Sequence, residues 1–154
     1  MTLLTALDFA AVLIFALTGA LSASRAQLDL VGFAFLAALT GIGGGTLRDV
    51  LLDRNPIFWI EQPSYLALTS LAALLVFFTA HLVESRYRLL LWIDAVALGV
   101  AVAAGIGVAL AMEQPAIIAI LMGIVTGCMG GLMRDVVCNE VPMVLRQGEL
   151  YVSA

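Results

Sequence analysis

The amino-acid sequence predicts an all-α transmembrane protein built from an inverted repeat of three-helix units. Three observations lead to this fold class. The 154 residues are 63% hydrophobic and only 12% charged, the apolar stretches between the charges have the length of membrane spans, and one glycine-rich block occurs twice. Soluble domains carry about 25% charged residues. The apolar excess of this chain must therefore face lipid rather than water.

Five apolar stretches are long enough to cross a membrane. A helix that rises about 1.5 Å per residue needs roughly 20 residues to span the hydrocarbon core. The stretches do not alternate between apolar and polar residues, so a β-barrel is excluded and helices are expected. We expect the spans at residues 7–24, 31–52, 65–83, 89–111 and 116–138.

The arginines between the predicted spans indicate the orientation of the chain. Arg54 lies on one side of the membrane. Four other arginines fall on the opposite side: Arg25, Arg86, Arg88 and Arg146. The positive-inside rule places the arginine-rich side in the cytoplasm and the N-terminus outside.

Aromatic side chains gather near the ends of the predicted spans. Such amphipathic rings commonly anchor a helix at the membrane interface, and we expect that role here. The residues concerned are Trp59, Tyr65, Tyr87, Trp92 and Tyr151.

Charge and motif content exclude several function classes. The formal net charge is −4, and all seven basic residues are arginines. Because no basic run could follow a phosphate backbone, nucleic acid is not an expected partner. The sequence has no cluster of metal ligands, no nucleophile elbow and no phosphate-binding loop, so we expect neither an enzyme nor a bound cofactor.

The most informative feature is an internal repeat with a constant offset of 86 residues. Residues 41–50 read GIGGGTLRDV and residues 127–136 read GCMGGLMRDV. The same offset relates five further pairs of identical residues: Asp8 and Asp94, Gly19 and Gly105, Thr40 and Thr126, Pro56 and Pro142, Tyr65 and Tyr151. Each repeat holds three spans, and an odd number makes the second copy enter the membrane from the opposite side.

The repeat divides the chain into two parts. We expect a first three-helix repeat at residues 1–86 and a second, incomplete repeat at residues 87–154. In this register residue 154 corresponds to residue 68. The partner of the third span is therefore expected to begin near Leu150 and to lie mostly beyond residue 154, in a longer form of the chain or in another chain.

The glycines of the repeated block interrupt two spans. Glycine in a helix interior costs roughly 1 kcal/mol relative to alanine. We therefore expect the spans at 31–52 and 116–138 to kink or partly unwind at Gly43, Gly44, Gly45, Gly130 and Gly131. Irregular backbone at membrane depth lies inside the protein or beside water, where it presents carbonyl groups to cations. The alternative is close helix packing through small residues.

Arg48 and Asp49 follow the first set of glycines, and Arg134 and Asp135 follow the second. An ionised side chain at the bilayer centre costs about 2.5–3.5 kcal/mol, so each should face a partner or a wet cavity. Because neighbouring residues on a helix point about 100° apart, each arginine is expected to find its carboxylate elsewhere. We predict the crossed pairs Arg48–Asp135 and Arg134–Asp49. The alternative is that the side chains of both motifs extend to the membrane–water interface, where the helices end.

Asp8 and Asp94 fall at the starts of the first and fourth predicted spans. A carboxylate there suits the helix dipole, which favours a capping role. The second interpretation is that the two residues line an ion entrance.

At these residues the sequence resembles the prokaryotic TRIC family of trimeric intracellular cation channels, whose domain is also named glycine transporter. The resemblance rests on GIGGGTLRD at residues 41–49, on Pro56 with Phe58 and Trp59, and on the second copy at 127–135, and it covers essentially the whole chain. It implies a homotrimer among the lipids of a prokaryotic inner membrane, with a potassium-permeable, monovalent-cation pore in each protomer. Family members have two inverted three-helix repeats and a seventh helix.

The resemblance also implies roles for particular residues. It assigns the kinks of the pore-lining second and fifth spans to Gly43, Gly44, Gly45, Gly130 and Gly131. It places a charged motif near the pore at Arg48, Asp49, Arg134 and Asp135. Because Met129 replaces the first glycine of the second triplet, the second kink is expected to be milder.

Three functions are compatible with the sequence. A passive channel for potassium or sodium is the leading interpretation. The alternative is a secondary transporter of glycine or a similar small zwitterion, which would use the inverted halves for alternating access. A non-conducting structural or assembly fragment is the third.

Overall fold

A computed structural model describes residues 3–82 and 86–145. These residues form helices and no strands. The long helices are α1 (Leu3–Arg25), α2 (Leu30–Leu51), α4 (Ser64–Thr79), α5 (Arg86–Ala111) and α6 (Ala116–Val137). The short helical segments are α3 (Phe58–Glu61), η1 (Ala80–Leu82) and η2 (Met143–Leu145).

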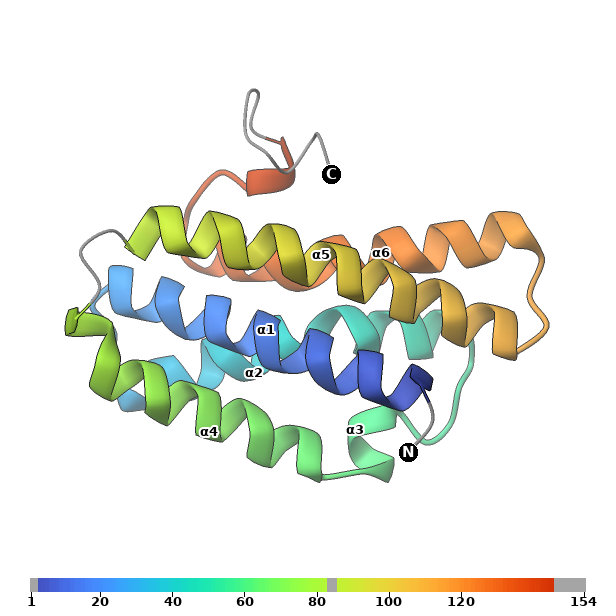
Figure 1. Cartoon of the computed structure of the whole chain (residues 1–154), viewed down its shortest axis with the longest axis horizontal. Helices are drawn as coiled ribbons and strands as arrows, with labels where there is room; N and C mark the ends of the chain where they lie inside the picture. Colours follow the sequence, from blue (N-terminus) through green and yellow to red (C-terminus); the bar gives the residue numbers. More distant parts are fainter. Residues whose placement is uncertain (1–2, 83–85, 146–154) are drawn as a thin grey trace.

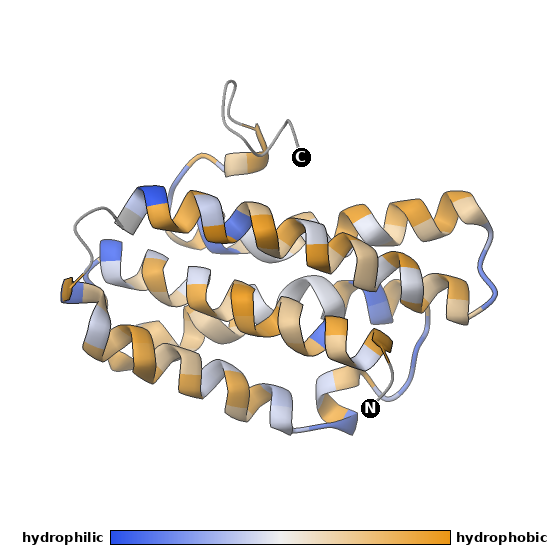
Figure 2. Cartoon of the chain, in the orientation of Figure 1, coloured by the Kyte–Doolittle hydropathy of each residue, from blue (hydrophilic) through white to orange (hydrophobic). Residues whose placement is uncertain are grey.

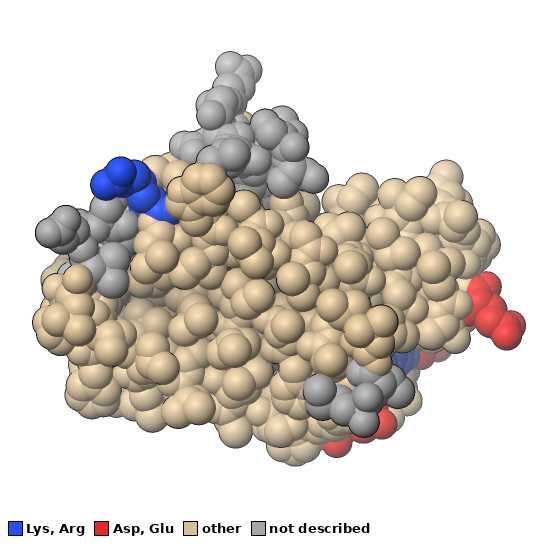
Figure 3. Space-filling view, viewed as in Figure 1, with Lys and Arg blue, Asp and Glu red and all other residues tan. Residues whose placement is uncertain are grey.

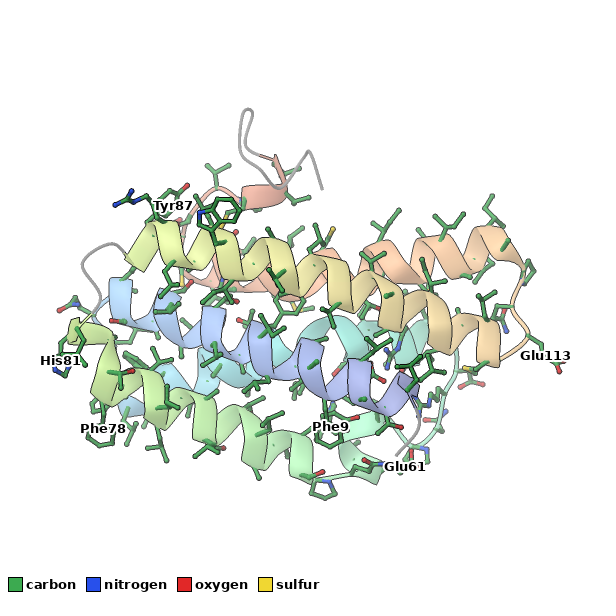
Figure 4. The ribbon with its side chains drawn as sticks, in the orientation of Figure 1. Phe9, Glu61, Phe78, His81, Tyr87 and Glu113 are labelled. Atoms are coloured by element: carbon green, nitrogen blue, oxygen red, sulfur yellow. The ribbon has the colours of Figure 1, made fainter. Side chains whose placement is uncertain are left out.

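The long helices pack as an antiparallel bundle with α1 at its centre (Figure 1). Helix α1 contacts α2, α4 and α5, and α6 packs against both α5 and α2. The contact between α2 and α6 joins the two halves of the chain, as does the contact between α1 and α5. Figure 4 places Glu61 and Glu113 at one end of the bundle and His81 and Tyr87 at the other. We call these the Glu113 end and the Tyr87 end.

Within the described residues, five helices are long and apolar enough to cross a membrane. Apolar residues cover the sides of the bundle, and hydrophilic residues gather mainly in the turns at its two ends (Figure 2). The space-filling view shows a largely uncharged surface between the ends, with basic atoms at one end and acidic atoms beside a few basic ones at the other (Figure 3). The prediction of an all-α transmembrane fold is confirmed, and the five spans begin and end within four residues of the expected positions.

The two halves end their helices with the same turns. Among the described residues, the non-glycine residues with positive φ are Gln27, Asp53, Glu113 and Asn139. Gln27 and Glu113 follow α1 and α5 and are 86 residues apart, as are Asp53 and Asn139 after α2 and α6. A left-handed residue at this position lets the next N–H bond back onto the last helical turn. The backbone thus repeats the offset that the sequence shows.

Two expectations need correction. Helices α2 and α6 continue without interruption through the glycines, so partial unwinding is not found.

Tyr65 is not an interfacial anchor, because its ring is buried and stacks on Phe9 with the centroids 4.0 Å apart. Trp59 is half-buried and donates a hydrogen bond from Nε1 to Thr46 Oγ1. Trp92, in contrast, is 62% exposed near the Tyr87 end, whereas Tyr151 and the expected start of a further helix near Leu150 lie outside the described residues.

Candidate functional site

The glycines of the repeated block bring α2 and α6 into backbone contact. A Cβ atom on Gly44 would overlap the carbonyl oxygen of Thr126 in α6, and a Cβ atom on Gly130 would overlap the carbonyl oxygen of Thr40 in α2. These two contacts are related by the 86-residue offset. The crossing of α2 and α6 is therefore a reciprocal one, in which each helix places a glycine against a threonine of the other.

Each of these threonines also contacts a second helix of its own repeat, which is α1 for Thr40 and α5 for Thr126. Gly19 of α1 lies against Thr40, and Gly105 of α5 lies against Thr126, with no room for a Cβ atom in either case. Thr40 and Thr126 each donate their hydroxyl hydrogen to a carbonyl of the preceding turn. Their hydroxyls are thus satisfied within the helix, which leaves smooth surfaces for close packing.

The remaining predicted glycines have different surroundings. Gly45 lies against the ring of Phe58, where a Cβ atom would come within 2.7 Å of Cε1. Gly43 borders an apolar groove of about 440 Å³ along α2, beside Met133. Gly131 is buried within α6.

Arg48 is fully buried and forms the centre of one ionic cluster. Its Nε donates to Asp49 Oδ1 at 2.8 Å, and its Nη1 donates to Asp8 Oδ1 at 2.9 Å. Its Nη2 has no hydrogen-bond partner in the described part of the chain. Asp8 belongs to α1 and Arg48 to the last turn of α2, so this cluster lies toward the Glu113 end.

Arg134 forms the corresponding cluster toward the Tyr87 end. Its Nε donates to Asp135 Oδ1 at 2.8 Å. Asp94 of α5 accepts two hydrogen bonds from it, Nη1 to Oδ1 at 2.8 Å and Nη2 to Oδ2 at 3.2 Å. The hydroxyl of Thr18 in α1 accepts a further hydrogen bond from Nη1 at 3.0 Å. This bidentate geometry is the stronger form of arginine–carboxylate pairing.

These contacts overturn two predictions. The crossed pairs Arg48–Asp135 and Arg134–Asp49 are wrong, since each arginine pairs within its own repeat and also with the aspartate that follows it. The Cα–Cβ bonds of the arginine and the following aspartate point in different directions. The arginine side chain is long and flexible enough for its guanidinium to reach that aspartate nevertheless. The alternative that these motifs reach the interface is also wrong for the arginines, which are 0% exposed.

The capping role predicted for Asp8 and Asp94 is likewise wrong. Helix α1 begins at Leu3 and α5 at Arg86, so both aspartates lie inside their helices rather than at the first residue. Each is the ion-pair partner of the arginine 40 residues later.

Asp49 and Asp135 have a second role that the sequence did not suggest. Asp49 Oδ2 accepts a hydrogen bond from the backbone N–H of Phe58 at 3.0 Å, and Asp135 Oδ2 accepts one from Met143 N–H at 2.9 Å. Each carboxylate thereby holds the beginning of a short helix, α3 or η2, against the end of a long one. In each repeat, one aspartate thus links the buried arginine to the loop that follows the long helix.

Two cavities meet at Asp8. A vestibule of about 260 Å³ opens at the Glu113 end between α1, α5 and Arg54, and Asp8 lines its inner side. A narrower cavity lies deeper between the halves, lined by Asp8, Thr40, Gly44, Thr126 and neighbouring apolar residues. It offers water about 10 Å³, which is about the room for one molecule.

The two clusters differ in formal charge. The Arg134 cluster places two carboxylates on one guanidinium, which leaves one formal negative charge in excess. In the Arg48 cluster, Arg54 Nη1 also lies 3.7 Å from Asp49 Oδ2, so that two carboxylates are balanced by two guanidiniums. Rings or clusters of carboxylates are a common basis of cation selectivity in pores. Among the described residues, no group of three or more His, Cys, Asp or Glu residues could hold a metal ion.

Known proteins resemble this chain over almost its whole length. A family model described as "Glycine transporter" matches residues 5–81 and 91–154. A UPF0126 membrane protein of Vibrio cholerae is 45% identical over 157 residues, which cover 99% of this chain and 64% of the relative. The UPF0126 inner membrane protein YadS of Escherichia coli K12 is 39% identical over 152 residues, which cover 96% of this chain and 72% of the relative. The chain thus spans less than two thirds of the length of the Vibrio relative.

A solved structure shares the fold. The crystal structure of the TRIC trimeric intracellular cation channel orthologue from Rhodobacter sphaeroides matches with a TM-score of 0.94 and 44% identity, over 99% of this chain and 78% of that one. The chain therefore belongs to the family of bacterial membrane proteins that is described as glycine transporter and that includes this TRIC orthologue.

Proposed function

We propose that this protein is a channel for monovalent cations, permeable to potassium and sodium. The observation that carries the proposal is the position of Asp8, which lines both the vestibule and the narrow cavity between the halves. The carboxylate of Asp8 offers oxygen ligands to a cation in the vestibule, whose lining also includes Arg54. The name of the Rhodobacter structure, a cation channel orthologue, supports the same assignment.

The proposed passage runs within one protomer, between the repeats at residues 1–86 and 87–154, and α2 and α6 form part of its wall. Gly44, Gly45 and Thr126 line the narrow cavity. A hydrated cation does not fit into a space for about one water, so conduction needs the cavity to widen. Glycines at the α2–α6 crossing allow these helices to bend there, which is the role we propose for Gly43, Gly44, Gly45, Gly130 and Gly131.

We place the protein in a bacterial inner membrane as a homotrimer with the N-terminus outside. The arginine distribution supports this orientation, because Arg25 and Arg88 lie toward the Tyr87 end whereas Arg54 lies toward the Glu113 end. An inner membrane protein of Escherichia coli among the relatives and the trimeric name of the Rhodobacter structure support the location and the assembly.

A second function is favoured by the description of the family model, glycine transporter. The inverted halves and the vestibule on one side are also the arrangement that alternating access requires. A transporter would carry glycine in a saturable manner, coupled to an ion gradient, whereas a channel would pass potassium without saturation at comparable concentrations.

Flux measurements on the full-length protein in liposomes separate these functions. We expect potassium efflux down its gradient, detected with a potassium electrode, and no accumulation of radiolabelled glycine. Liposomes without protein give the baseline. Saturable glycine uptake driven by a sodium or proton gradient would instead identify a transporter, and the absence of both fluxes would leave the structural role.

A further inference from the structure

Phe15 lies on α1 between the two buried arginine clusters. Asp8 belongs to the Arg48 cluster, and the hydroxyl of Thr18 accepts a hydrogen bond from Arg134. A helix rises about 1.5 Å per residue, so Phe15 lies about 10 Å beyond Asp8 and about 5 Å before Thr18 along the helix axis. Seven residues make about two helical turns, which places Phe15 on the same face of α1 as Asp8.

Helix α5 has the corresponding arrangement in the opposite direction. Asp94 belongs to the Arg134 cluster, Ala101 lines the narrow cavity, and Val108 lines the vestibule. These three residues are also spaced by about two helical turns, so they share one face of α5. The 86-residue offset makes Ala101 the counterpart of Phe15. Phe15 and Ala101 therefore lie at the middle level of the two helices.

The apolar cluster around Phe15 is mapped onto itself by the repeat. Its members are three pairs of counterparts: Ala11 and Ala97, Phe15 and Ala101, and the partly buried Ile14 and Val100. Inverted halves are related by a pseudo-twofold axis in the membrane plane. A cluster that contains the counterpart of each of its members lies on that axis, midway through the membrane.

The two halves fill this central space unequally. Phe15 is 2% exposed and Ala101 is 1% exposed, and both line the narrow cavity. One half supplies an aromatic ring at the axis, whereas the other supplies a methyl group. Of the α1 residues that line this cavity, Phe15 is the farthest along the helix from Asp8 and the vestibule. The ring of Phe15 therefore lies at the inner end of a space that holds about one water.

We propose that Phe15 is the residue that limits cation permeation through the passage. Its ring separates the water-accessible side at Asp8 from the side at Asp94. A cation must lose water to pass an apolar ring, and hydrophobic constrictions gate pores by excluding water. Permeation then requires the ring to turn away from the axis or α1 and α5 to move apart. This role rests on the proposed channel function, whereas the barrier that the ring forms can be tested without a current.

A ring that only fills the core would behave differently from a ring that blocks a passage. Shortening any large buried side chain lowers stability, because it leaves a cavity. Leu21 provides the matched control on the same helix. It is 3% exposed and belongs to a different apolar cluster. Leu21→Ala therefore creates a cavity in α1 packing without removing the ring at the axis.

The reaction of silver ions with an introduced thiol measures the barrier directly. Silver is a monovalent cation that binds thiol groups. In full-length protein with Cys128→Ser and Cys138→Ser, Ala97→Cys places a thiol between Ala101 and Asp94 on α5, on the far side of the ring from the vestibule. Thiols that remain free are counted with a maleimide after denaturation.

We expect silver to react slowly at Ala97→Cys while Phe15 is present. Adding Phe15→Ala should raise the rate about tenfold, which corresponds to a barrier lower by about 1.4 kcal/mol. Adding Leu21→Ala instead should leave the rate unchanged. An unchanged rate in folded Phe15→Ala protein would overturn the barrier. So would an equal rise with Leu21→Ala, because any loosening of the core would then be sufficient.

Potassium efflux from liposomes tests the effect on permeation. Phe15→Ala should raise the efflux rate about tenfold, by the same lowering of the barrier, and Leu21→Ala should not. The exchange variant, which combines Phe15→Ala with Ala101→Phe, should restore the wild-type rate, because the ring then reaches the axis from the other half. Melting temperatures in detergent show which variants fold. If the exchange variant does not fold, Phe15→Leu replaces it, with an efflux rate between those of wild type and Phe15→Ala.

Unchanged efflux in folded Phe15→Ala protein that conducts as wild type would overturn the role of Phe15 in permeation. A folded exchange variant that remains as fast as Phe15→Ala would also overturn it. If neither the wild-type protein nor Phe15→Ala passes potassium, the channel function itself is overturned. The silver reaction at Ala97→Cys still decides in that case whether the ring of Phe15 forms a barrier to a small cation.

Discussion

Gly44 of α2 lies so close to the carbonyl oxygen of Thr126 in α6 that a Cβ atom would not fit between them. Through the repeat, Gly130 has the same relationship to Thr40. The two halves of the chain are therefore joined by two backbone-to-backbone contacts, and the narrow cavity lies beside them. Any side chain added at either glycine must push α2 and α6 apart.

Replacing Gly44 or Gly130 by alanine should destabilise the protein. Forced overpacking in a well-packed interior typically costs about 1–3 kcal/mol, and here the obstacle is backbone, which cannot rotate away. Denaturant titration of the full-length protein in detergent micelles measures the change in the free energy of unfolding. Gly99→Ala is the matched control, since Gly99 is exposed and a Cβ atom added there would have nothing within 4 Å. The alanine there should be neutral or slightly stabilising. Equal losses at all three positions would show that the close crossing is not the cause.

Removing the guanidinium of Arg134 should cost far more than removing that of Arg25. Arg134→Met leaves two buried carboxylates, Asp94 and Asp135, without their counter-charge, and breaking a buried ion pair in this way typically costs about 3–5 kcal/mol. Arg25→Gln breaks only a partly exposed pair, for which about 0–1 kcal/mol is usual. The same denaturant titration compares the two variants. Similar losses would mean that the Arg134 cluster is more solvated than its burial indicates.

The transmembrane helices could be predicted from the sequence, because the length of an apolar stretch nearly decides whether it spans a bilayer. The repeat could also be predicted from the sequence, since the glycine, arginine and aspartate residues of the block recur in register. The ion pairs of the buried arginines were not predicted correctly. Helix α1 starts at Leu3, four residues before the expected position, and this small error turned the buried Asp8 into an expected cap.

One signal for the correct pairs was present. Asp8 and Arg48 are 40 residues apart, and so are Asp94 and Arg134. Because the aspartate and the arginine recur together in each repeat, a contact within one repeat can be made in the same way in the other. The contacts from Asp49 to Phe58 N–H and from Asp135 to Met143 N–H could not be found in this way, because their spacings differ by one residue. They depend on the folded loops.

The orientation of the chain makes a prediction that is independent of transport. Ala26 is exposed in the turn between α1 and α2, and Gln62 is exposed between α3 and α4, at opposite ends of the bundle. If the N-terminus lies outside, a membrane-impermeant maleimide added to intact cells should label Gln62→Cys and should label Ala26→Cys only after lysis. Both variants are made with Cys128→Ser and Cys138→Ser. The reverse pattern would place the arginine-rich end outside, against the positive-inside rule.

The thiol of Cys138 should react slowly at neutral pH. Burial raises the pKa of the Cys138 thiol above its ordinary value, and nearby Glu140 raises this pKa further. The thiolate is the nucleophile, so a raised pKa lowers the reactive fraction at pH 7. In full-length Cys128→Ser protein, the rate of alkylation by iodoacetamide should therefore keep rising above pH 8.5, approximately where an ordinary thiol reaches its midpoint. Ala26→Cys, an exposed thiol at the same end, is measured in the Cys128→Ser, Cys138→Ser background as the reference. If limited access alone slowed the reaction, the rate of Cys138 would be lower at every pH, but the midpoint of its pH profile would equal that of Ala26→Cys. Equal midpoints would therefore contradict the effect of burial on the pKa of the Cys138 thiol.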